Sequence, residues 1–352
     1  MDISTVIEYK DKSYKFGFHI TKECTISKTI SSVVKADYSA MQIFITNPRS
    51  KYPPSYDLKD IKFARNLLNK SKTYMCVHGS LLYNLCGSVD HKKDPKFNEK
   101  IDSTSKSLLR ELDICAALGV GVVVHIGSCK DKKEGIKTIC QLINTLLVKV
   151  VPDTGKIAKS IDMSVSRFIK KRKIILENAA GEGNKIGSTI EEIGLIMDGL
   201  DKEIKNQVKI CIDTAHAYGA GIYDWGKVEE VHRFYKDFED RIGLKYLEVF
   251  HLNDSRISND KRFDAPFGSR KDRHANLGFG YMFFSNEGQE SLREFLLLAR
   301  KHRIAMISEV PYEEDINGEL TKVNRDLLFV YSLLLNTDYP MVEHKIINKN
   351  DK

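Results

Sequence analysis

The stretch from Leu247 to Gly280 reads LEVFHLNDSRISNDKRFDAPFGSRKDRHANLGFG. Its first six residues have the apolar character of a strand that is buried on both faces, and this strand ends at His251. The loop that follows is polar and basic, and it places Asp272 two residues before His274. Imidazole and carboxylate ligands together suit zinc or manganese. The stretch therefore predicts a strand and a loop that supply ligands to a metal site.

Segments of strand character alternate with segments of helix character eight times along the chain. The strand candidates are Lys15–Ile20, Tyr38–Thr46, Thr73–Gly79, Val120–Gly127, Lys173–Ala179, Val208–Ala215, Leu247–Asp254 and Ala305–Pro311. Most are short and nearly continuous in apolar residues, which is typical of strands in a parallel sheet. The amphipathic stretches include Lys100–Leu118, which Gly119 ends, Glu287–His302 and Asn317–Leu335. This order predicts an α/β fold, a (β/α)₈ TIM barrel.

The length of 352 residues suits one TIM-barrel domain. We expect the barrel at residues 15–337, a peripheral N-terminal segment at 1–14 and a polar C-terminal tail at 338–352. Residues 156–173 form a basic helical segment, for which we expect a solvated face.

Composition and charge favour an intracellular protein. No apolar run approaches the roughly 20 residues that span a bilayer, and the polar N-terminus lacks the apolar core of a signal peptide. The seven cysteines form no CxxC pair, so we expect reduced and mostly buried thiols, although spacing alone leaves a disulfide open. We expect a cytoplasmic or nuclear location, or association with the virion if the chain is viral. The net charge of +7 is a mild indication of a polyanionic partner.

Six consecutive strand candidates carry His, Asp or Glu at or just after their ends. The nine side chains are His78, His125, Glu177, Asp213, His216, His251, Asp272, His274 and Glu309. In a parallel barrel these ends meet at one rim, where the active site is built. One zinc takes about four ligands, so nine side chains suit two or three metal ions. A lone histidine at a strand end is more often a packing residue, but packing does not explain nine residues in phase with the strands.

The other histidines have no such pattern. His19 also ends a strand candidate, and we expect it to pack or to support the ligands from behind. We expect surface positions for His91, His232, His302 and His344.

Seven motifs resemble those of the endonuclease IV family of abasic-site DNA repair enzymes (AP endonuclease family 2), over about residues 15–335. They are VHGSLLYNL, VVVHIGS, ILENAAGEGNKIG, CIDTAHAYGAGIYD, HLNDS, GSRKDRHANLGFG and SEVPY. The resemblance implies a TIM barrel with three zinc ions. It assigns His78, His125 and Glu177 to the first ion, Glu177, Asp213, His251 and Glu309 to the second, and His216, Asp272 and His274 to the third. Glu177 would be the catalytic bridge between two ions.

The resemblance also implies an activity and a partner. The activity is that of a zinc-dependent deoxyribonuclease IV (phage-T4-induced type), a phosphoric diester hydrolase that cuts 5′ to abasic sites. The products would be a 3′-hydroxyl and a 5′-deoxyribose phosphate, and blocked 3′ ends would be trimmed as well. The partner would be double-stranded DNA with abasic sites, bound by a monomer.

The residues that would bind DNA are carried over from the same family. Arg49 matches an arginine that enters the duplex, and Leu81 and Leu82 match a pair that wedges into the base stack. The alternative for the two leucines is helix packing. Six basic residues could contact phosphates or simply keep a loop solvated: Arg256, Lys261, Arg262, Arg270, Lys271 and Arg273.

Two other classes of function fit the same barrel. A sugar isomerase or epimerase would use one or two metals, and it would have no use for His216, Asp272 and His274 as a third set. A DNA-binding protein without activity would be expected to have lost ligands, and this chain keeps all nine.

Overall fold

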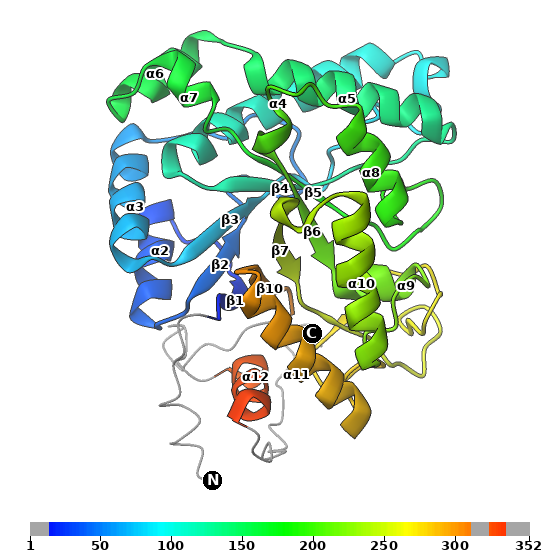
Figure 1. Ribbon diagram of the computed structural model, residues 1–352. Helices are drawn as coiled ribbons and strands as arrows, with labels where there is room; N and C mark the ends of the chain where they lie inside the picture. Colours follow the sequence, from blue (N-terminus) through cyan, green and yellow to red (C-terminus); the bar gives the residue numbers. More distant parts are fainter. Residues whose placement is uncertain (1–13, 311–323, 336–352) are drawn as a thin grey trace.

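The computed structural model describes residues 14–310 and 324–335. Within them eight parallel strands close into a barrel in the order β1-β10-β7-β6-β5-β4-β3-β2 (Figure 1). The strands are β1 Phe16–His19, β2 Ala40–Ile43, β3 Tyr74–His78, β4 Gly121–His125, β5 Ile174–Glu177, β6 Val208–Asp213, β7 Leu247–His251 and β10 Ala305–Ser308. Each lies inside one of the eight predicted segments, so the TIM barrel is confirmed.

Small side chains fill the inside of the barrel. One buried cluster takes residues from seven of the strands, and it consists of Ala40, Cys76, Val123, Ile175, Cys211, Val249, Ala305 and Ile307. The eighth strand, β1, contributes Gly17, where an added Cβ would lie 1.7 Å from the carbonyl oxygen of Ala40. Only glycine fits at this close approach.

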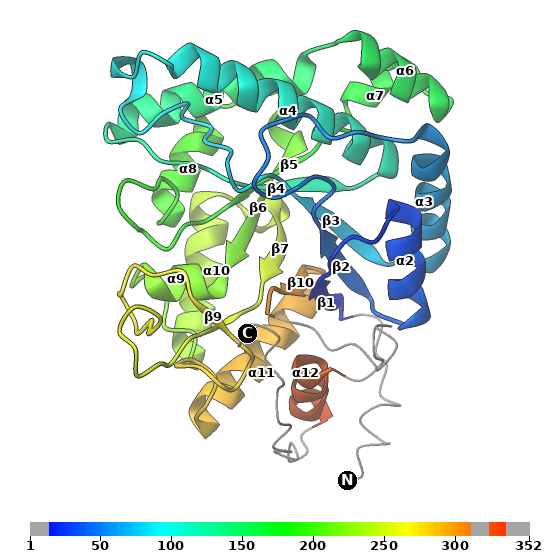
Figure 2. The same cartoon turned by 180° about the vertical axis from the view of Figure 1, so that it is seen from behind.

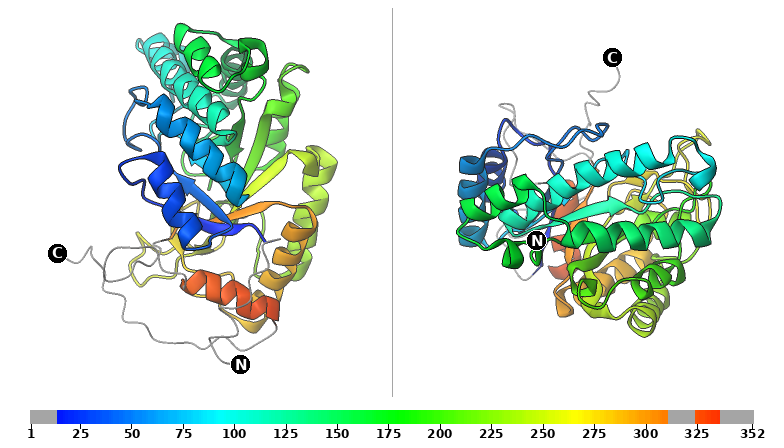
Figure 3. Two further views of the ribbon diagram at one scale, coloured as in Figure 1. Left: turned by 90° about the vertical axis from the view of Figure 1, so that its left-hand side faces the viewer. Right: turned by 90° about the horizontal axis from the view of Figure 1, so that it is seen from above.

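Helices surround the barrel (Figures 1 and 3). They are α2 Ile26–Lys35, α3 Leu58–Ser71, α4 Phe97–Leu118, α5 Lys132–Val148, α6 Pro152–Ser160, α7 Val165–Ile169, α8 Ile190–Asp198, α9 Thr214–Gly219, α10 Val228–Arg241, α11 Asn286–Lys301 and α12 Arg325–Leu335, with short 3₁₀ turns at His91–Lys93, Lys205–Gln207 and Leu244–Tyr246. Their apolar faces and the outward faces of the strands form the larger core. Gly119 ends α4 in the left-handed conformation, as its position predicts.

The long loop between β7 and α11 is held in place by two buried carboxylates. It contains a hairpin of β8 (Asp254–Ser255) and β9 (His274–Ala275), and it lies beside α9 (Figure 2). Asp254 accepts the backbone N–H groups of Gly278, Gly280, Met282 and Phe283 at 3.0–3.3 Å. Asp326, on α12, accepts the Leu277 N–H and the Ser308 hydroxyl. The loop is therefore tied both to its own strand and to the last helix.

Two predictions about surface residues need correction. His91 is buried, because its ring packs on Phe97 and its Nε2 lies 2.7 Å from the Thr138 hydroxyl. The basic segment at 156–173 is split between α6 and α7, and most of its lysines are exposed as predicted, but Arg172 is buried against Asp113 with an Nε–Oδ1 distance of 2.8 Å. His232 and His302 are exposed, as predicted.

The cysteines are free, and six of the seven are buried while Cys24 is exposed. Within residues 14–310 and 324–335, no single helix is long and apolar enough to cross a membrane; α5 and α6 reach that length only together, across a 53° bend. His344, the tail at 338–352 and nearly all of the segment at 1–14 lie outside the described residues.

Candidate metal centre

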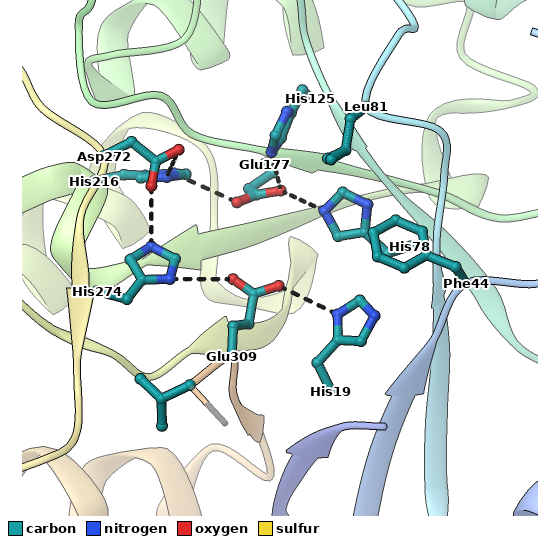
Figure 4. Close-up of a pocket in the computed structure, with 11 residues that line it drawn as sticks. His19, Phe44, His78, Leu81, His125, Glu177, His216, Asp272, His274 and Glu309 are labelled. Carbon is teal, nitrogen blue, oxygen red and sulfur yellow. Dashed lines mark ion pairs between the residues drawn. The ribbon is translucent and has the colours of Figure 1, made fainter. Parts of the chain in front are cut away.

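Five of the predicted ligands are the last residues of consecutive strands. His78, His125, Glu177, Asp213 and His251 end β3, β4, β5, β6 and β7, respectively. Glu309 follows the last residue of β10. Because the strands are parallel and paired in register, these side chains gather at one rim of the barrel. Figure 4 shows His78, His125, Glu177 and Glu309 at this rim.

The other three ligands come from α9 and from the loop after β7. Asp213 caps α9 by accepting the His216 backbone N–H at 2.7 Å, which places His216 one turn beyond the strand end. The ring of His216 lies with Nε2 3.1 Å from Asp272 Oδ2. Asp272 Oδ1 is in turn 3.3 Å from His274 Nε2, so both loop residues point into the site as predicted.

Glu177 lies between two groups of imidazoles. Its Oε2 is 3.4 Å from His78 Nε2 and 3.2 Å from His125 Nε2. Its Oε1 is 3.2 Å from His251 Nδ1 and 3.4 Å from His216 Nδ1. Each oxygen therefore faces a different group, which is the geometry expected of a bridging carboxylate.

The donor atoms form three groups, and the atoms of each group lie within 4.8 Å of one another. The groups are His78, His125 and Glu177; Glu177, Asp213, His251 and Glu309; and Asp213, His216 and His274. The first two match the predicted sets. The third contains Asp213 where the prediction has Asp272, because Asp213 Oδ2 is 3.4 Å from His274 Nε2. Asp272 contacts both histidines of this third group, so the prediction and the geometry are compatible.

The charges of the site are strongly coupled. Burial opposes ionisation of Glu177, but His125 and His251 hold the pKa of its carboxyl well below the usual value. Burial likewise opposes protonation of His216, yet Asp213 and Asp272 raise the pKa of that imidazole far above its usual range. The Glu177 carboxylate therefore stays ionised and requires positive charge next to it.

The donor atoms fit metal ions. Glu177 Oε2, His216 Nε2 and His274 Nε2 are buried, and within the described part of the chain they contact other candidate ligands without forming a well-directed hydrogen bond. Buried polar atoms rarely stay without a partner, so these atoms indicate positions for ligands of another kind. A set of imidazole nitrogens and carboxylate oxygens is typical of zinc sites.

Members of all three donor groups line one open pocket of about 400 Å³. Its walls also include apolar side chains, and the lining residues are His19, Phe44, His78, Leu81, His125, Glu177, His216, Asp272, His274, Glu309 and Val310 (Figure 4). His19 lies in this wall, 3.6 Å from Glu309, which agrees with a supporting role.

Of the three residues predicted to bind DNA, Leu81 lines this pocket. Leu81 and Leu82 are 44% and 41% exposed and lie in a turn, so helix packing is the wrong description of both. Arg49 is exposed on the neighbouring loop, which is joined to the turn by the hydrogen bond from Leu81 N–H to the Pro48 carbonyl. The pocket wall thus includes one of the three side chains, and the other two are exposed in the two segments that this hydrogen bond joins.

Three buried amides that hold the ligands were missed by sequence reasoning. Asn178 accepts the Asp213 backbone N–H at 2.6 Å, and Asn253 donates to Asp213 Oδ2 at 2.8 Å. Gln42, on β2, contacts both His251 and Glu309. Asn178 and Asn253 lie close to ligands in the sequence, which could have marked them, but no local pattern distinguishes Gln42.

Known proteins share this fold and much of this sequence. The family model of AP endonuclease family 2, described as a xylose isomerase-like TIM barrel, matches residues 30–287. Apurinic-apyrimidinic endonuclease 1 of Saccharomyces cerevisiae is 31% identical over 313 residues, which cover 86% of this chain and 72% of that protein. Endonuclease IV from Thermus thermophilus superposes with a TM-score of 0.64 at 25% identity, covering 87% of this chain and 94% of that one.

The fold and the donor groups together define a xylose isomerase-like TIM barrel whose rim could hold several metal ions. Within this class, the chain belongs to the endonuclease IV family, also called AP endonuclease family 2. A D-tagatose 3-epimerase-like protein shares the fold alone, with a TM-score of 0.53 and 17% identity.

Proposed function

We propose that the protein is an AP endonuclease of the endonuclease IV type that hydrolyses the phosphodiester 5′ to abasic sites in double-stranded DNA. The products are a 3′-hydroxyl and a 5′-deoxyribose phosphate, and three zinc ions per chain serve the reaction. We also propose that it trims blocked 3′ ends. The observation that carries the proposal is the position of Glu177, whose two oxygens face separate imidazole groups in one pocket.

The residues of the site have distinct tasks. His78, His125 and Glu177 hold the first ion, and Glu177 is shared with a second ion that Asp213, His251 and Glu309 complete. His216, Asp272 and His274 hold the third. When bound, closely spaced divalent ions activate water and stabilise negative charge on a phosphate. Asn178 holds the backbone of Asp213 and Asn253 donates to its carboxylate, so this ligand is held in place before the substrate enters.

The DNA lies across the open side of the pocket in this proposal. Leu81 lines the pocket, Arg49 and Leu82 are exposed in the adjoining segments, and an aliphatic wedge can unstack bases at a damaged site. The loop after β7 adds exposed Arg256, Lys261, Arg262 and Arg270, which suit contacts with backbone phosphates. All nine ligands come from one chain, so the site is complete in a monomer.

A sugar isomerase or epimerase is the alternative function on this fold. A neutral sugar gains little from a third cation, whereas a phosphodiester gains charge stabilisation where the leaving oxygen departs. The third donor group therefore favours the nuclease.

The test combines metal analysis with two activity assays on the purified wild-type protein. We expect about three zinc ions per chain, because each donor set suits one ion, and cleavage of a duplex with one abasic site but not of the undamaged duplex. Binding of two or fewer metals, together with interconversion of ketoses and aldoses and intact abasic DNA, would establish the isomerase instead.

A further inference from the structure

Gln42 is a fully buried amide in the wall of the barrel, below the proposed metal centre. It lies on β2, which contributes no ligand to the rim in the described part of the chain, although every strand from β3 to β7 does. Its neighbours in the sheet are His19 on β1 and Cys76 on β3. From this position its side chain contacts residues from four other strands or strand ends.

The contacts of Gln42 are hydrogen bonds of defined direction. Its Nε2 donates to Glu309 Oε1 at 2.9 Å and lies 3.0 Å from His19 Nδ1. Its Oε1 lies 2.9 Å from His251 Nε2 and accepts from the Cys76 thiol at 3.2 Å. Because a carboxylate only accepts, Glu309 fixes which end of the amide is nitrogen, and the amide oxygen must then face His251.

This orientation fixes the protonation of His251. An amide oxygen has no hydrogen to donate, so His251 Nε2 must carry the proton that joins the two groups. In the neutral ring, the form that binds a metal, the lone pair is then on Nδ1, which lies 3.2 Å from both Glu177 Oε1 and Glu309 Oε2. The Gln42 amide also orients Glu309. Because Glu309 Oε1 accepts the hydrogen bond from Gln42, Glu309 Oε2 is the oxygen that faces the other donor atoms of the second group.

We infer that Gln42 is a positioning residue for the second metal ion, an inference that rests on the proposed function. It sets the tautomer of His251 and the orientation of Glu309, so that two of the four ligands present the correct atoms. Outer partners of metal ligands typically contribute about 10- to 100-fold in metal affinity. Neither a carboxylate nor an ammonium at position 42 could both donate to Glu309 and accept from His251.

Gln42→Met tests the inference, because methionine has a similar volume and neither hydrogen-bonding group. Zinc bound per chain is measured in buffers of graded free zinc, for wild type and variant. We expect one of the three ions to bind about 10- to 100-fold more weakly in the variant. Gln42→Asn keeps an amide that is one methylene too short to reach both partners, so we expect the same loss in a variant that disturbs packing differently.

Gln207→Met is the matched control. Gln207 lies before β6, at the other end of the barrel, and its amide donates to the Ile169 and Arg172 carbonyls at 2.8 and 3.0 Å. We expect this variant to lose thermal stability and to keep three zinc ions. If it loses zinc to the same extent as Gln42→Met, the effect comes from lost buried hydrogen bonds in general, and the inference is overturned.

The tautomer provides a second readout that does not depend on activity. With ¹⁵N-labelled histidine, NMR should show the His251 proton on Nε2 in the wild type, protected from exchange with solvent, and exposed to faster exchange in Gln42→Met. A proton on Nδ1 in the wild type overturns the inference, as does unchanged zinc affinity in both Gln42 variants. Failure of the proposed function is distinguishable, because it shows in the metal content and DNA cleavage of the wild type.

Discussion

At the scale of single residues, the centre depends on one carboxylate that two donor groups share. Glu177→Gln keeps the shape of Glu177 and removes its charge. We expect cleavage of abasic DNA to fall at least about 10²–10³-fold, a loss typical of removing one electrostatic contact, while circular dichroism and the melting temperature show a folded barrel. Near-normal cleavage by the variant would show that Glu177 does not bridge two ions.

Glu111, on α4, is predicted to give the protein a measurable pH dependence of stability. Burial raises the pKa of its carboxyl from 4.5 to about 8, although Tyr83 and His78 act in the opposite direction. The folded protein therefore keeps this proton longer than the unfolded chain does. The stability that comes from the neutral acid is fully present below the unfolded pKa and is lost as the pH rises through about 8.

Glutamine at position 111 imitates the neutral acid at every pH. Glu111→Gln should therefore remove the loss of stability that ionisation of Glu111 causes as the pH rises. Urea unfolding between pH 5 and 8, with zinc saturating, should give a shallower decline in the free energy of unfolding for the variant. The difference is limited to about 1.4 kcal/mol for each unit of pKa shift. Glu99→Gln, on the exposed side of the same helix, is the control that should follow the wild type. Parallel curves for wild type and Glu111→Gln would contradict the assignment.

The nine candidate ligands could be predicted from sequence because most of them sit at or just after the end of an apolar strand, and Asp272 and His274 follow one of these strands in a single loop. The burial of three polar residues could not be predicted, because nothing in the neighbouring sequence shows it. These residues are Gln42, Arg172 and His91. Arg172 depends on Asp113, and His91 on Thr138, both far away in sequence. Polar residues become buried when distant partners satisfy them, and a single sequence does not show those partners.

At the scale of elements, the loop after β7 supplies Asp272 and His274, two of the three residues proposed to hold the third ion. Asp272→Ala combined with His274→Ala should remove about one zinc ion and leave the barrel folded, because the other ligands stay on strand ends and α9. Cleavage should fall by at least about 10²–10³-fold. Asn259→Ala is a control in the same loop, since that side chain is exposed and has no role in the proposed site. Unchanged zinc content in the double variant would exclude a third ion at this loop.

The eight strands could be predicted because buried parallel strands are apolar over most of their length. The hairpin of β8 and β9 could not be predicted, because two-residue strands are too short to show a periodic pattern of apolar residues. The break between α6 and α7 was missed for a related reason. It occurs around Asp162, which adopts a positive φ of 55°, and an aspartate does not signal such a turn as clearly as a glycine would.

At the scale of the whole molecule, the net charge of +7 and the exposed basic loop suit a long anionic partner. Replacing Arg49, Leu81 and Leu82 by Ala should weaken binding to abasic duplexes strongly and leave zinc content unchanged. If Arg49 contacts a phosphate, the variant should also show a shallower plot of the logarithm of the binding constant against the logarithm of the salt concentration. The slope should change by about one.

Lys236→Ala is the control for this triple variant, because Lys236 lies on α10 and pairs with Asp240 of the same helix. Binding would be measured at several salt concentrations by fluorescence anisotropy. Equal affinity of the triple variant and the wild type would assign lesion recognition to other residues.

The pairing of β1 with β10 also determines when the protein can become active during its synthesis. Phe16 pairs with Met306, so the first strand leaves the ribosome long before its partner has been translated. Until then, β1 has an open edge that can pair with other chains. Glu309 lies just beyond the same late strand, so a nascent chain has neither a closed barrel nor a full set of ligands. Under the proposed function, stalled or prematurely released chains should therefore lack nuclease activity, and their open strand edge should make them prone to aggregation.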